Sequence, residues 1–141
     1  MEMESTALAT SHLAMAMTEM SEGKTVASLW HGLMAVGFAW ENKILLRPLY
    51  LFAVVFLALE CRALGSIGYA FKAFDRVDIA VPLLGFHYGL MSFDAADEPT
   101  MSRTAHGVMA LTYAMSLPGK KSELEGENED VRQHNEHDRN A

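Results

Sequence analysis

The 141-residue chain has room for one domain at most, and 50% of its residues are apolar, only slightly above the average for a soluble protein. Its net charge of −7 excludes an electrostatic attraction to nucleic acid, because such binding depends on basic residues that neutralise phosphates. The single cysteine, Cys61, excludes an internal disulfide, and its place beside an apolar run predicts a small buried side chain.

The first segment, residues 1–24, is polar and acidic. It begins Met-Glu-Met-Glu, where a secretory signal peptide would carry positive charge, so no signal peptide is predicted. Its alanines and methionines suit a short helix. The positions that would form a buried face do not make a clean apolar stripe: Leu8, His12, Met15 and Glu19. We therefore predict a mobile N-terminal segment with a weak helix.

The middle of the chain, residues 25–117, consists of apolar blocks joined by short charged turns. No alternation of apolar and polar residues indicates a strand, so the fold class is all-α. The sequence predicts about four helices. Their expected ranges are 26–41, 44–60, 62–91 with a break near a charged cluster or Pro82, and 104–117.

The apolar blocks are shorter than the roughly 20 residues of an ideal transmembrane helix. They are nevertheless apolar on all sides, and short charged turns are typical of antiparallel helices that meet at a membrane interface. These features predict a small membrane-embedded bundle, integral and multi-pass. Its expected partners are membrane lipid and either another protein or a second copy of the chain. The orientation and the particular membrane stay open.

The last segment, residues 118–141, is almost entirely charged and amide side chains with two aliphatic residues, Leu124 and Val131. It cannot bury enough apolar surface to offset the entropy of ordering. A disordered acidic tail is predicted.

An apolar helix, a tight charged turn and the sequence Arg62-Ala63-Leu64-Gly65 are followed by Asp78, then by His87 and His106. Over about residues 49–117 this order resembles small four-helix membrane proteins of the DoxX-like type, which occur in bacteria and filamentous fungi. The resemblance implies a four-helix membrane fold. It implies no activity, because that group of proteins is uncharacterised.

The acid–base candidates are Asp78, Glu60 and His87. An ionisable residue inside a membrane is a functional suspect, which singles out Asp78. The cluster around it, residues 72–78, carries four charges, and burying all four would be costly, so we favour a helix break in which these charges pair with one another. Glu60 lies at a turn and could line the mouth of a pocket, although a plain interfacial turn is the preferred reading.

Three histidines lie in apolar blocks: His31, His87 and His106. Two on facing helices could hold haem, and three could hold a metal ion. None has a second histidine or a carboxylate three or four residues away, so no cofactor and no metal are predicted.

Three functions therefore remain open. The favoured one is an accessory or partner-binding integral membrane protein. The second is an intramembrane enzyme, an isomerase, cyclase or redox accessory, that acts on a hydrophobic metabolite. The third is a soluble helical interaction domain. The sequence does not decide whether the chain is an enzyme.

Overall fold

The structure is a computed structural model that describes residues 2–95 and 97–117. Within these residues the fold is all-α, with six helices and no strand. The helices, in chain order, are α1 (Met3–Ser21), α2 (Thr25–Ala39), α3 (Lys43–Leu59), α4 (Ala63–Ala73), α5 (Val77–Asp94) and α6 (Thr100–Met115). The all-α prediction is confirmed. The predicted tail, residues 118–141, lies outside the described residues.

The predicted count of about four helices is wrong. The N-terminal segment forms a full helix, α1, and the long range 62–91 is two helices, α4 and α5. The division falls at residues 74–76 in the charged cluster, whereas Pro82 lies inside α5. None of the described helices combines the length and the apolar character needed to cross a bilayer.

Four helices end in the same way, on a turn of three residues. The middle residue of each turn has a positive φ: Gly23 (76°), Glu41 (50°), Cys61 (59°) and Asp75 (58°). The N–H of that residue bonds to the carbonyl three positions earlier, and the next N–H bonds to the carbonyl five positions earlier. This is the Schellman arrangement, which satisfies carbonyls that the last helical turn would leave free.

This turn explains one departure from the sequence prediction, at Cys61, and it accounts for the predicted break near the charged cluster. Cys61 is exposed, because it is the middle residue of a turn and not part of an apolar helix. Asp75 ends α4 in the same manner, so the charged cluster divides the predicted long helix. The cluster does not pair entirely within itself: Arg76 contacts Asp78 at 3.3 Å, but Asp75 pairs with Arg47 of α3 at 2.5 Å.

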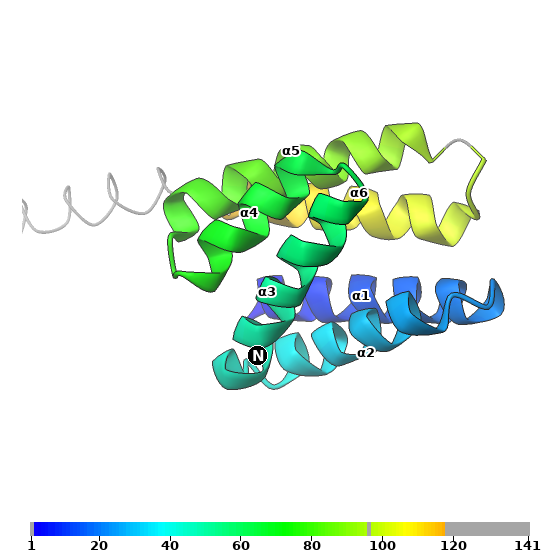
Figure 1. The fold of residues 1–141 in the computed structure, drawn as a ribbon, viewed down its shortest axis with the longest axis horizontal. Helices are drawn as coiled ribbons and strands as arrows, with labels where there is room; N and C mark the ends of the chain where they lie inside the picture. The colour runs from blue at the N-terminus through cyan, green and yellow to red at the C-terminus, as the bar shows by residue number, and fades with distance from the viewer. Residues whose placement is uncertain (1, 96, 118–141) are drawn as a thin grey trace, which may run out of the picture.

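The six helices form two antiparallel pairs joined by a crossing helix (Figure 1). The α1–α2 pair lies on one side, and α5 with α6 lies on the other. Helix α3 runs steeply from the first pair to the second, and α4 returns along α5. Helix α1 also packs against α6, so the two pairs meet along the middle of the molecule.

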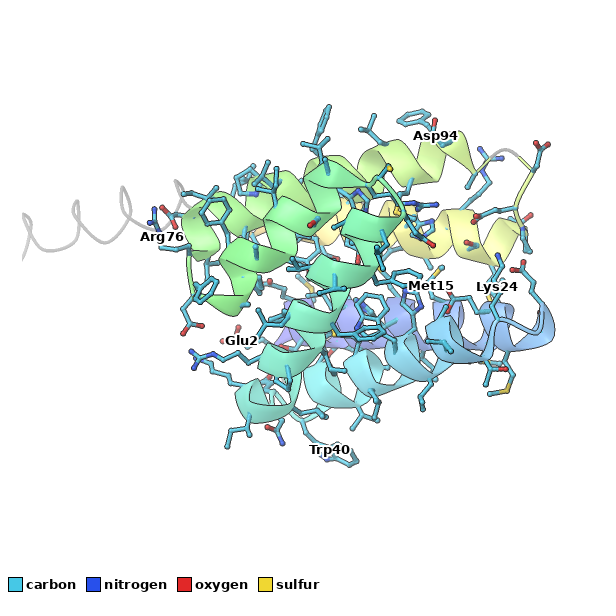
Figure 2. The ribbon with its side chains drawn as sticks, in the orientation of Figure 1. Glu2, Met15, Lys24, Trp40, Arg76 and Asp94 are labelled. Atoms are coloured by element: carbon cyan, nitrogen blue, oxygen red, sulfur yellow. The ribbon has the colours of Figure 1, made fainter. Side chains whose placement is uncertain are left out.

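The N-terminal helix is part of the core. The sequence predicts that residues 1–24 lie outside the helical domain, but α1 buries Leu8, His12, Met15 and Glu19. Their spacing of four, three and four residues is that of one helix face. Side-chain directions agree with this packing, since Met15 points inward whereas Trp40 and Asp94 point away from the bundle (Figure 2).

The close approach of α4 and α5 gives a test of the packing. A Cβ added at Gly68 would lie 2.9 Å from Cγ of the fully buried Leu84. We expect Gly68→Ala to lower the free energy of unfolding by about 1–3 kcal/mol, because this part of the core has no room to yield. The measurement is chemical denaturation followed by circular dichroism.

Gly32→Ala is the matched control. A Cβ at Gly32, in α2, would meet nothing within 4 Å. The same change there should raise the free energy of unfolding by up to about 1 kcal/mol, since alanine is the better helix former. Equal effects of the two substitutions would contradict the described packing.

Candidate functional site

A cavity of about 480 Å³ opens near one end of the bundle, and all six helices or their turns contribute to it. We call it the six-helix cavity. Its buried floor consists of aromatic, histidine and a few other side chains: Met15, Thr18, Glu19, Trp30, His31, Leu57, Tyr69, His87, Tyr88, Ser102 and His106. Its rim is exposed and charged, with Glu22, Lys24, Glu60, Arg62 and Glu98.

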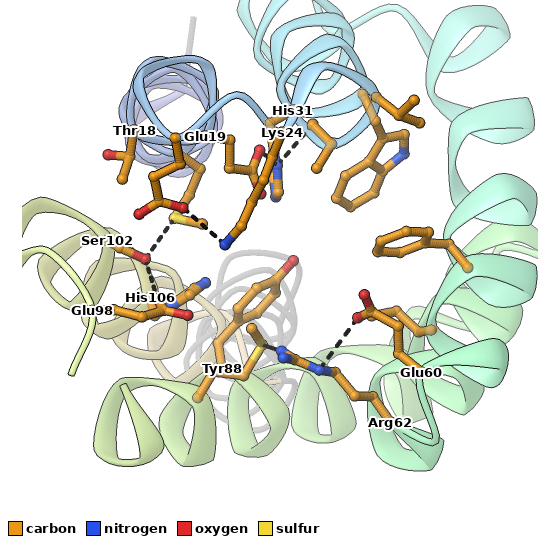
Figure 3. Close-up of a pocket in the computed structure, with 18 of the residues that line it drawn as sticks. Thr18, Glu19, Lys24, His31, Glu60, Arg62, Tyr88, Glu98, Ser102 and His106 are labelled. Atoms are coloured by element: carbon orange, nitrogen blue, oxygen red, sulfur yellow. Dashed lines mark hydrogen bonds and ion pairs between the residues drawn. The ribbon is translucent and has the colours of Figure 1, made fainter. Parts of the chain in front are cut away.

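A short polar contact in the floor joins α1 to α2. The carboxylate of Glu19 accepts a hydrogen bond from Nδ1 of His31 at 2.5 Å, and the two side chains are only 11% exposed. The contact is possible because the turn between α1 and α2 brings residues twelve positions apart onto facing helices. The centroids of the Trp30 and His31 rings lie 4.5 Å apart, so the indole packs against the imidazole. Figure 3 shows this pair at the cavity wall.

Two tyrosines meet on the opposite side of the floor. The hydroxyl groups of Tyr69 from α4 and Tyr88 from α5 hydrogen-bond to each other. The Tyr88 ring stacks on the His106 ring with centroids 6.0 Å apart. Burial raises the pKa of Tyr88 to about 12, and it raises that of Tyr69 well above the ordinary value, so both stay protonated at neutral pH.

Three buried histidines stay neutral. Burial lowers the pKa of His12 to about 3, and charge on the nearby His31 acts in the same direction. Burial also lowers the pKa of His87 to about 4, with a smaller contribution from Arg62. The pKa of His106 falls to about 4 by burial, although Glu98 opposes the shift. These rings can donate or accept hydrogen bonds without carrying charge.

Four of the five rim charges form two ion pairs, and the fifth, Glu98, contacts a hydroxyl group. Lys24 contacts Glu22 at 2.8 Å, and Arg62 contacts Glu60 at 3.4 Å. Glu98 accepts a hydrogen bond from the Ser102 hydroxyl at 2.6 Å. The opening is therefore polar, while the interior offers neutral hydrogen-bonding groups among aromatic rings.

The structure brings two of the three acid–base candidates to this cavity. Glu60 lies at the rim and His87 lies in the floor. Asp78 lies elsewhere, exposed at the first turn of α5, where the Arg76 guanidinium beside it lowers the pKa of its carboxyl. His31 and His106, considered from the sequence for haem or metal, also line the cavity. Within the described residues, no group of three His, Cys, Asp or Glu side chains could hold a metal ion.

Sequence reasoning missed Glu19, Tyr88 and Ser102 as cavity residues. A signal for Glu19 was present, because it continues the helical face of His12 and Met15. No comparable signal marked Tyr88 or Ser102.

Comparison with protein-family models, with curated proteins and with solved structures gives no match to this chain. The resemblance to DoxX-like membrane proteins therefore stays a prediction.

The lowered histidine pKa values predict a loss of stability in acid. The unfolded chain protonates these side chains near pH 6.5, but the folded chain binds those protons only near pH 3–4. Stability is therefore fully present above pH 6.5 and falls as the pH drops toward 4, by roughly 2 kcal/mol for each histidine at pH 5. Denaturant unfolding at pH 7 and pH 5 measures the difference.

His12→Leu is the control for this pH dependence. It removes one of the three titrating rings at a position outside the cavity floor, so about a third of the loss between pH 7 and pH 5 should vanish. A free energy of unfolding that is equal at the two pH values in the parent chain would contradict the burial of these histidines.

Proposed function

We propose that the protein binds a small, largely apolar molecule in the six-helix cavity. The observation that carries this proposal is the composition of the floor, where aromatic rings surround a few inward polar groups. Small-molecule sites have this composition, and their usual volume of about 300–1,000 Å³ includes that of this cavity.

The polar groups of the floor support a ligand with little charge. His87 and His106 are neutral at pH 7, and the two cations of the rim already have partners of opposite sign. An apolar body would displace water from the cavity, while a polar substituent could bond to an imidazole or a hydroxyl.

Naphthalene is a suitable probe for the cavity, because its fluorescence changes on transfer from water to an apolar site. We expect saturable binding to the parent chain. Met91→Trp, at the cavity wall, should weaken binding by about tenfold, because the larger side chain occupies space that the probe needs. Fluorescence titration gives both affinities.

Met115→Trp makes the same exchange on α6 at a position that is 68% exposed. It should bind naphthalene as the parent does. Absence of saturable binding to the parent, or equal weakening by the two substitutions, would contradict the proposal.

A second candidate, an accessory or partner-binding protein embedded in or on a membrane, is favoured by the outer surface. Large apolar side chains are exposed on every helix, including Met17 (60%), Leu29 (64%), Val55 (61%), Ile67 (46%), Phe86 (60%) and Leu111 (62%). Extended apolar surfaces of this kind are typical of contacts with lipid or with another protein. A lipid-embedded protein could also carry the six-helix cavity, so the two functions are compatible.

Alkaline carbonate extraction of cell membranes tests this second candidate. The parent chain should stay in the membrane pellet. Replacing Leu29, Leu33 and Val36 by glutamine should release part of it, because these exposed residues form one outer stripe of α2. The control variant carries glutamine at three exposed positions that are already polar, and it should stay in the pellet as the parent does. Release of the parent chain into the supernatant would favour the soluble interaction domain instead.

A further inference from the structure

We propose that the ligand of the six-helix cavity is a neutral hydroxyl compound, a phenol or an enol on a flat apolar body, and that His31 accepts its hydroxyl proton. This inference rests on the proposed function, because it names the ligand class of the same cavity. It also assigns the proton acceptor to a residue that is distinct from the sequence candidates Asp78, Glu60 and His87.

The tautomer of His31 is fixed by its neighbours. The Nδ1–H group faces the Glu19 carboxylate at 2.5 Å and the Ala27 carbonyl at 3.1 Å, and both are acceptors. The proton of the neutral ring therefore resides on Nδ1, and the lone pair is on Nε2. A carboxylate that orients an imidazole in this way is the usual arrangement of a general base.

The proposed step is a proton transfer that balances within the site. The O–H bond of the ligand breaks, the Nε2–H bond of His31 forms, and the electron pair stays on the ligand oxygen. The Glu19 carboxylate balances the positive charge on the imidazolium, so Glu19 is a positioning residue. The reverse transfer restores the neutral ligand, and no oxidant or reductant takes part.

The charges around the cavity disfavour an anionic ligand. Among the described residues that line it, the two permanent cations, Lys24 and Arg62, already contact Glu22 and Glu60. An acid would therefore enter without a free counter-ion, whereas a hydroxyl compound needs none. Trp30, Tyr69 and Tyr88 line the cavity, and an aromatic wall of this kind suits an aromatic or conjugated body.

The groups nearest to His31 do not compete for this role. His12 lies 5.8 Å away between ring centroids, but its Nδ1–H donates to the Leu8 carbonyl and its ring is fully buried. His106 lies in the floor, and its buried Nδ1 has no hydrogen-bond partner among the described residues. Unlike His31, His106 has no hydrogen bond to a carboxylate among the described residues, so nothing orients its ring as a base.

The test compares 2-naphthol with naphthalene, which has the same body without the hydroxyl. The full chain should bind 2-naphthol about tenfold more tightly than naphthalene. Excited 2-naphthol is a strong acid, so in contact with a base it should emit as naphtholate, and in an apolar site without a base as neutral naphthol. Excitation beyond tryptophan absorption isolates this signal.

The variants separate a base from a merely structural residue. His31→Phe should bind the two probes with equal affinity and give naphthol emission. Glu19→Gln is the conservative partner if that variant does not fold, and it should reduce the naphtholate emission while keeping the probe bound. Asp78→Asn, outside the cavity, should behave as the parent in both measurements.

Two results would overturn the inference. Equal affinity of the parent for the two probes, or naphtholate emission unchanged in both His31→Phe and Glu19→Gln, would exclude His31 as the acceptor while leaving cavity binding intact. Failure of the parent to bind either probe would overturn the proposed function as well.

Discussion

The hydrogen bond between the hydroxyl groups of Tyr69 and Tyr88 lies where the two halves of the bundle meet. It joins α4 to α5, and each of the two rings also packs against a residue of another helix. The centroids of the Tyr69 ring and the Trp30 ring of α2 lie 5.9 Å apart, and the Tyr88 ring stacks on His106 of α6 with centroids 6.0 Å apart. Each hydroxyl satisfies the other away from water, and leaving one unpaired would cost about 1–3 kcal/mol. The same contact forms part of the cavity floor, so fold and candidate site depend on one pair of side chains.

Polar residues on buried helix faces weaken the sequence pattern that marks a helix. A helix is normally located by an apolar stripe, and the buried face of α1 instead reads Leu8, His12, Met15 and Glu19. Two of those four residues are polar because they take part in the contacts around His31. The rule that buried faces are apolar therefore fails at the place where the candidate site is built.

Much of the architecture was accessible from the sequence. The all-α class and the turns near Asn42 and Cys61 follow from apolar blocks interrupted by charges. The helix count did not follow, because the break near Asp75 was assigned to the interior of one long helix and the N-terminal helix has a buried face that is partly polar. For the site, the sequence identified Glu60, at a turn, and His87, in an apolar block, as acid–base candidates. The contact of Glu19 with His31 depends on how two helices face each other, which local spacing does not specify.

The repeated helix-ending turn has a consequence for how this protein could change. Its hydrogen bonds use backbone atoms, and the residues that follow the positive-φ position in two of the turns are Lys24 and Arg62. Both side chains stand at the entrance of the cavity. The turn therefore holds these two positions through the backbone, whichever side chains they carry. The entrance is free to diverge, in nature or by design, and a new selectivity could arise there while the bundle beneath it stays as it is.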